Sequence, residues 1–353
     1  MTFFRIVFFI AITTISLKAK SQSQPETGES LIFLLEQTAV DSIKRNTLIK
    51  LADINSSIDK ERSINYYQQA LEYDMVDTRK ASVLNTIGFS YWRLGNFSNA
   101  LNNYHQSLSI YTSLQDSTQI GRVINNIATA SWSLGKWNDA LENYQTALKF
   151  RKAANQMKGV SNILNNIGLI YQDFGVYDEA LAYHNEALEI ALEINNAAAI
   201  SYSYSNIGLC YMLKKEFDLA MKYHKLGFKI YSENENDGRN NSYFLANIGA
   251  VFSKTGNIDS ALNYNSRSLE QATLINNKHR IAVAENSLGA NHLRLGNINI
   301  AAKHINNSNK SALKNNYKDL LRDNQFALAE IEEIRGNTKQ ALTLLQKCRG
   351  YKR

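Results

Sequence analysis

The chain repeats itself about every 40 residues, and this periodicity limits its possible folds more than any other feature. In each repeat a small residue such as Gly88 is followed seven residues later by a turn such as Gly95-Asn96. An alanine such as Ala100 follows five residues after the start of that turn. Apolar residues between these positions fall at helical spacing, so each repeat is predicted to be a helix, a turn and a second helix. The small residues are Gly88, Ala128, Gly168, Gly208, Gly249, Gly289 and Ala329.

A repeat of this kind predicts an all-α α-solenoid. Two antiparallel helices pack closely only where a small side chain lies at their crossing, which explains why glycine or alanine recurs. One hairpin cannot bury its apolar face alone, so neighbouring hairpins must stack into a continuous core. The chain has a single proline, Pro25, so uninterrupted helices are allowed throughout the repeats.

The repeat resembles the tetratricopeptide repeat family. Leu84, Ile87, Gly88, Tyr91 and Ala100 match the family pattern in one unit, and the unit at Gly168 matches it again. The period of 40 exceeds the usual 34 or so of that family, and the closing proline is absent, so the helices should be longer. In this respect the chain is similar to kinesin light chains and LGN-type scaffold proteins. The resemblance implies a right-handed superhelix of about seven to eight hairpins, whose first helices line a concave groove.

Before the array, residues 1–21 are interpreted as a signal peptide. A positively charged start at Arg5 precedes an apolar stretch over residues 6–17, and Ala19 and Ser21 fit a cleavage site. An uncleaved anchor is the alternative. Residues 22–41 are assigned to a linker and an N-terminal capping helix, and residues 42–350 to the array. Its expected units are 42–77, 78–117, 118–157, 158–197, 198–238, 239–278, 279–318 and 319–350.

Composition and motifs argue against catalysis and nucleic-acid binding. The formal charge of +7 falls to +4 without the leader (36 basic against 32 acidic residues), and the charges are scattered. No phosphate loop, nucleophile elbow, zinc-protease or paired-cysteine motif occurs, so no cofactor or metal site is expected. His184 and His224 share one repeat position and could approach each other, but a hydrogen-bonding or partly exposed repeat position is favoured over a metal or pH-sensing role. Cys210 and Cys348 are expected to be packing residues.

Asparagines at two adjacent positions of the first helices are the candidate binding residues. An asparagine side chain both donates and accepts hydrogen bonds, so a row of them could hold an extended peptide backbone. The resemblance to kinesin light chain repeats, in which asparagine there contacts peptide, supports this role. The alternative is that these residues tie helix to helix. They are Asn126, Asn166, Asn206 and Asn247, with Asn85, Asn125 and Asn165 one position earlier.

Two tryptophans complete the predicted site, and together these residues predict the function. Trp92 and Trp132 share one repeat position and could anchor a ligand side chain, or else pack against a neighbouring hairpin. Only Arg122 approximates a carboxylate clamp, so a C-terminal carboxylate is not predicted as the ligand. We expect an exported, periplasmic or extracellular scaffold that binds a protein or extended peptide without catalysis. The alternative is the sensor portion of a bacterial signalling protein.

Nothing after the leader is apolar enough to span a membrane. The second helix of the last unit carries Leu342, Leu344 and Leu345 with no polar capping helix after it. Repeat arrays generally need such a cap. This end is therefore expected either to form a homodimer or to continue into a longer protein.

Overall fold

The computed structural model describes residues 27–234 and 241–350, and within them every regular element is an α-helix. The predicted signal peptide at residues 1–21 lies outside the described residues. The helices are α2 (Gly28–Gln37), α3 (Asp41–Asn55), α4 (Lys60–Ala70), α5 (Asp77–Arg93), α6 (Phe97–Ser113), α7 (Ser117–Ser133), α8 (Trp137–Ala153), α9 (Met157–Asp173), α10 (Tyr177–Glu193), α11 (Ala197–Leu213), α12 (Phe217–Asn234), α13 (Ser242–Lys254), α14 (Ile258–Leu274), α15 (Lys278–Arg294), α16 (Ile298–Asn315), α17 (Lys318–Ile334) and α18 (Thr338–Gly350).

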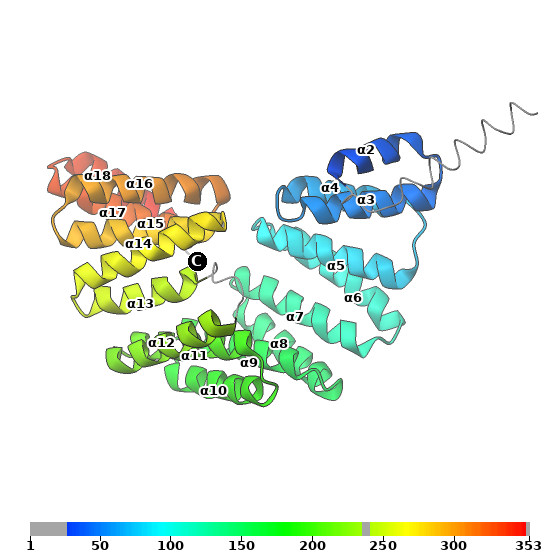
Figure 1. Cartoon of the computed structure of the whole chain (residues 1–353), viewed down its shortest axis with the longest axis horizontal. Coiled ribbons are helices and arrows are strands. Elements are labelled where there is room, and N and C mark those ends of the chain that lie inside the picture. The colour runs from blue at the N-terminus through cyan, green and yellow to red at the C-terminus, as the bar shows by residue number, and fades with distance from the viewer. Residues whose placement is uncertain (1–26, 235–240, 351–353) are drawn as a thin grey trace, which may run out of the picture.

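From α3 to α18 the helices pair in chain order as antiparallel hairpins, and each hairpin packs on the next (Figure 1). The predicted all-α solenoid is therefore confirmed. At the N-terminal end, α2 packs on α3 and buries Leu31, which is 2% exposed. No helix in the described ranges has the length and apolar character needed to cross a membrane.

The small residue of each repeat lies where its two helices cross. A Cβ atom added to Gly88 would lie 2.6 Å from the Tyr104 ring, and one added to Gly168 would lie 2.5 Å from the His184 ring. Real Cβ atoms do not approach neighbours so closely, so these positions need glycine for the helices to pack. The recurring glycine thus has the packing role that the sequence predicted.

Turns within and between hairpins use left-handed backbone. Inside the hairpins the turn residue is usually glycine with φ between 75° and 86°, and in the α11–α12 turn it is Lys215 with φ 63°. Between hairpins the left-handed residue is Gln115 or an asparagine such as Asn195, with φ near 50°. Glycine and asparagine tolerate this conformation best, which explains why both mark the repeat boundaries.

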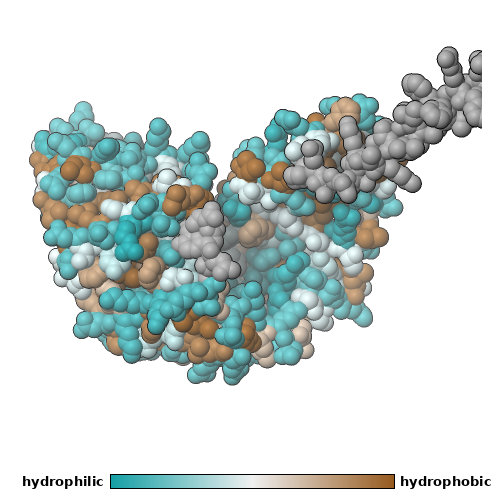
Figure 2. Space-filling view, viewed as in Figure 1, coloured by the Kyte–Doolittle hydropathy of each residue, from teal (hydrophilic) through white to brown (hydrophobic). Residues whose placement is uncertain are grey.

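The first helices of successive hairpins lie on the inner side of the curved array. From α5 to α17 each first helix contacts the next first helix, whereas no two second helices in the described chain do. The array therefore curves with α5, α7, α9, α11, α13, α15 and α17 on its concave side. It bends far enough that the α4–α5 region and the α16–α17 turn face each other across an opening (Figure 1), which Figure 2 shows as a hollow between the two ends.

Candidate functional site

Three of the four asparagines that share the repeat position of Asn126, namely Asn126, Asn206 and Asn247, join neighbouring first helices. Asn126 on α7 donates to the side-chain oxygen of Asn85 on α5 at 2.9 Å, and Asn206 on α11 donates to Asn165 on α9 at 3.2 Å. Asn247 continues this pattern on α13 by donating to a serine hydroxyl of α11 at 2.8 Å. The helix-to-helix tie that the sequence left open is therefore present in the structure.

These asparagines differ in how far a ligand could reach them. Asn85, Asn165 and Asn206 are each 8% exposed, so most of their surface is covered by protein. Asn126, Asn166 and Asn247 are half-buried, and Asn125 is half-buried as well. Contact between a peptide and these asparagines stays a prediction. Asn126, Asn166 and Asn247 are the ones whose exposed surface could make it.

Asn165 is the centre of a small buried network. Its side-chain oxygen accepts from Asn206 and lies 2.8 Å from Nδ1 of His184, while its amide donates to Ser203 at 2.8 Å. Burial lowers the pKa of His184 to about 3 and that of His224 to about 4, so both rings are neutral near pH 7. Each ring fills the space above a glycine, Gly168 or Gly208, and both side chains are 0% exposed. The position is therefore a buried hydrogen-bonding one, and the alternative of a partly exposed position is wrong.

Both predicted tryptophans reach forward to the next first helix. The indole Nε1 of Trp92 donates to Ser133 Oγ at 2.9 Å, and that of Trp132 donates to Asp173 Oδ2 at 3.0 Å. Trp92 also stacks on Phe89, with ring centroids 5.8 Å apart. Both side chains are half-buried, so part of each indole ring is exposed to solvent while its Nε1 is hydrogen-bonded.

Sequence reasoning missed two aromatic side chains that are open to solvent on first helices. Phe89 on α5 is 45% exposed and Tyr202 on α11 is 37% exposed. Phe89 lies one turn from the predicted Trp92, and Tyr202 lies one turn before Asn206. Other repeats hold unlike residues at the same positions, such as Thr129 at the position of Phe89 and Arg122 at that of Tyr202. The periodicity alone therefore did not single out the two aromatic residues.

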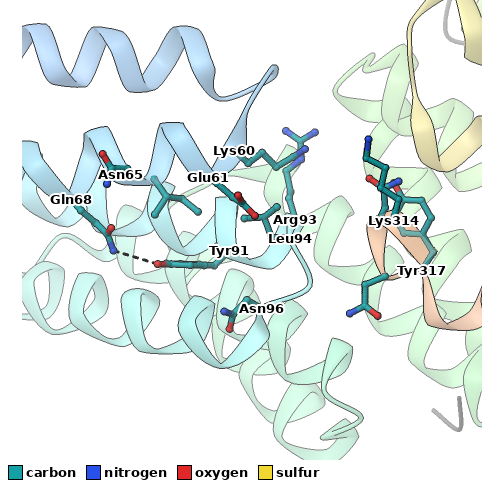
Figure 3. Close-up of a pocket in the computed structure, with 13 residues that line it drawn as sticks. Lys60, Glu61, Asn65, Gln68, Tyr91, Arg93, Leu94, Asn96, Lys314 and Tyr317 are labelled. Atoms are coloured by element: carbon teal, nitrogen blue, oxygen red, sulfur yellow. Dashed lines mark hydrogen bonds between the residues drawn. The ribbon is translucent and has the colours of Figure 1, made fainter. Parts of the chain in front are cut away.

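Where the two ends of the array face each other, they enclose a cleft of about 540 Å³. Figure 3 shows Lys60 and Arg93 on one side of this cleft and Lys314 and Tyr317 on the other. Gln68 donates to the Tyr91 hydroxyl at 3.3 Å on the near wall. Most side chains around this opening are polar, and its charged groups are three cations and the Glu61 carboxylate. Such a lining suits a polar ligand better than an apolar one.

Neither cysteine forms a disulfide. Cys210 is buried on α11 and accepts from the Gln172 amide at 2.8 Å, and burial raises the pKa of its thiol to about 11. A thiol with so high a pKa carries little thiolate near neutral pH and is a poor nucleophile. Within the described ranges no cluster of three or more histidine, cysteine or acidic residues is arranged for a metal ion.

Comparison with known repeats agrees with this geometry. A sequence model described as tetratricopeptide repeat matches residues 79–153 and 159–233. These two segments belong to the tetratricopeptide repeat family. No protein of curated function matches its sequence.

Several solved structures share the fold at low sequence identity. A Rap protein complexed with Competence and Sporulation Factor is 15% identical, with a TM-score of 0.67 over 92% of this chain and 90% of that one. The Rap conjugation gene regulator of plasmid pLS20, in complex with the Phr* peptide, is 16% identical, with a TM-score of 0.60 over 87% and 94%. Aspartyl phosphate phosphatase F from Bacillus subtilis is 16% identical, with a TM-score of 0.52 over 99% and 81%. These likenesses concern the fold.

Proposed function

We propose that this chain is a non-catalytic scaffold that binds a protein or extended peptide on its concave face. The observation that carries the proposal is the half-buried asparagine row, Asn126, Asn166 and Asn247, on first helices that line this face. Two proteins with the same fold were solved with Competence and Sporulation Factor and with the Phr* peptide, which supports a peptide as ligand.

The hydrogen bonds between first helices suit this function. Asn126 donates to Asn85 and therefore cannot rotate freely, so its remaining polar surface is already oriented before a ligand arrives. A side chain held in one conformation loses less entropy on binding than a mobile one. Asn126, Asn166 and Asn247 together offer a peptide backbone polar partners on three first helices, without requiring a particular ligand sequence.

The test is capture of a partner from an envelope extract by the mature chain. We expect the triple variant Asn126→Ala, Asn166→Ala, Asn247→Ala to lose capture, because the three accessible amides are removed. Asn206 is left intact because it is buried in the network around Asn165. The matched control, Asn103→Ala, Asn143→Ala, Asn263→Ala, removes three amides from the second helices and should still capture the partner. Equal capture by both variants would refute the proposed role of the row.

Export to the periplasm or cell exterior remains part of this proposal. We expect cleavage after Ser21, so that the mature chain starts at Gln22. N-terminal sequencing of the protein recovered from the envelope fraction tests this. An intact Met1 in the membrane fraction would indicate the uncleaved anchor instead.

The second candidate is the sensor portion of a signalling protein. A signal transduction ATPase with a tetratricopeptide repeat sensor, from Pyrococcus horikoshii, shares the fold at 16% identity and a TM-score of 0.55. The chain spans 56% of that protein's length. Downstream DNA that encodes an apolar span of about 20 residues in frame would favour this candidate. A homodimer through the last repeat also stays a prediction, and Leu342 and Leu345 on α18 are exposed there, at 57% and 39%.

A further inference from the structure

The first and last described helices, α2 and α18, each have a face that no other helix covers. Among the described residues, every second helix from α4 to α16 packs both on the first helix of its own hairpin and on that of the next. In contrast, α18 contacts only α17, and α2 contacts only α3. The two helices lie at opposite ends of the curved array and do not meet within one chain (Figure 1). Both uncovered faces are therefore open to a second molecule.

The uncovered face of α2 is apolar in its centre and acidic at both ends. Its members lie at positions i, i+3, i+4 and i+7, so they share one side of the helix, and they are Glu29, Ile32, Phe33 and Glu36. All four are exposed, and Phe33 is 65% exposed, whereas Leu31 on the other side is buried. The helix carries no basic residue. A large exposed aromatic side chain between charged groups is typical of an interaction site.

The uncovered face of α18 has the same layout with the opposite charge. Leu342 and Leu345 are exposed one turn apart, and Lys339 lies one turn before Leu342. Lys347 is exposed near the other end of the helix, which carries no acidic residue. Neither these lysines nor the glutamates of α2 form an ion pair with another described residue. The two faces are therefore complementary in charge as well as in apolar character.

We propose that the chain associates head to tail, with α2 of one copy packed against α18 of another. Phe33 packs on Leu342 at the centre of this contact, and the glutamates of one copy lie near the lysines of the other. An apolar centre with a charged rim is the usual layout of a protein interface. The occupant is a second copy because this chain carries both complementary faces. The contact lies outside the concave face and goes beyond the proposed function.

Charge distinguishes this contact from a symmetric homodimer through the last repeat. Two α18 helices packed on each other bring Lys339 and Lys347 of both copies together, and two α2 helices bring glutamates together. Like charges that face each other disfavour both symmetric pairs, whereas the unlike pair brings opposite charges together. Because the two faces lie at opposite ends of the array, each copy can take two neighbours. Such contacts generate open chains or closed rings.

Sedimentation equilibrium of the mature chain tests the proposal. The contact is small, because α2 has 10 residues and is about 15 Å long, so association is weak. We expect the average mass of the wild type to rise above that of one chain as the concentration approaches about 1 mM, and to fall again at high salt. A wild type that stays monomeric over this range would overturn the proposal.

Reversing the charge of either face gives a sharper test. Glu29→Lys, Glu36→Lys makes the α2 face basic like α18, so this variant should be monomeric. Lys339→Glu, Lys347→Glu makes α18 acidic like α2 and should be monomeric as well. An equimolar mixture of the two variants should associate again, because a basic α2 face then meets an acidic α18 face. A mixture that stays monomeric would show that charge does not select the partner and would overturn the proposal.

Two further variants complete the test. The matched control Glu142→Lys, Glu189→Lys reverses two exposed charges on α8 and α10 and should associate like the wild type. Phe33→Ser keeps every charge and should weaken association at least about tenfold, because it removes the apolar centre. Unchanged association of Phe33→Ser, or association that is lost on reversal of α18 but survives reversal of α2, would assign the contact elsewhere and overturn the proposal.

Discussion

The α9–α10 and α15–α16 hairpins use the same geometry with different side chains. In the first, Tyr171 stacks on Tyr183 with ring centroids 5.3 Å apart and planes 13° apart. In the second, His292 stacks on His304 at 5.7 Å and 5°. The residue packed on the crossing glycine also differs, because His184 covers Gly168 whereas Ile305 covers Gly289.

This comparison shows which part of the repeat the fold requires. Two flat rings stack in both hairpins, and a small residue lies at the crossing in both, so these shapes are kept. The chemistry of the rings is not kept, and in α15–α16 it adds a hydrogen bond between His304 Nδ1 and Glu285 Oε2, which lie 2.5 Å apart. At the stacked-ring position and at the crossing glycine, shape is therefore limited more strictly than polarity, whereas the residue that covers the glycine varies in both.

The largest effect should come from adding one methyl group at the crossing glycines. Gly168→Ala would place Cβ 2.5 Å from a ring carbon of His184, which is buried and rigid, so we expect a loss of about 2 kcal/mol in the free energy of unfolding. Gly289→Ala meets the more flexible end of the Ile305 side chain at 2.6 Å and should cost about 1 kcal/mol or less. Chemical denaturation measures both.

Gly28→Ala is the control for these two variants, because nothing lies within 4 Å of the added Cβ. It should leave the free energy of unfolding within about 0.5 kcal/mol of the wild type. If Gly289→Ala proves as costly as Gly168→Ala, then the rigidity of the covering side chain is not what distinguishes the two hairpins.

The next effect is acid destabilisation through His184. Its pKa is about 3 in the folded chain and near 6.5 in the unfolded chain, so between these values the unfolded state binds more protons. Stability is therefore present above pH 6.5 and falls as the pH drops, by about 1.4 kcal/mol per pH unit for this residue. His184→Tyr should reduce the slope, because Tyr104 and Tyr144 hold the same repeat position.

Denaturation of the wild type and of His184→Tyr between pH 7.5 and about 5.5 tests this, since that window covers the unfolded pKa and gives an expected loss through His184 of about 1.4 kcal/mol. The variant should keep part of the slope, because burial also lowers the pKa of His224, to about 4. Identical slopes in the two proteins would mean that His184 does not control acid stability.

The smallest effect concerns the stacked histidines of α15–α16. Burial and the nearby His304 lower the pKa of His292, so this ring contributes stability above its unfolded pKa and loses it as the pH falls. His292→Tyr restores the aromatic found at Tyr171 and should stabilise the chain at pH 5 by less than about 1 kcal/mol, since solvent screens the site. At pH 8 the two proteins should unfold alike, and a difference there would show that packing, not charge, separates these hairpins.

The sequence by itself determined the repeat, the helical hairpins and their turns. The need for a small residue at position 168 is short-range, because the side chain that packs on Gly168 is that of His184, 16 positions later in the same hairpin. The turn glycines are required by the left-handed conformation of their own backbone, as at Gly175, where φ is 77°. Such local constraints recur in every repeat and can be read without knowing how the hairpins stack.

Only the tertiary structure decided what the polar side chains face. Asn126 was singled out by its repeat position, but its bond to Asn85 joins residues 41 positions apart and depends on how closely the first helices stack. The surroundings of Arg151 could not be recognised either, because they include Arg122 and, from the next hairpin, Gly159. Pairing between repeats is fixed by the small rotation of each hairpin on its neighbour, and no local sequence pattern records that rotation.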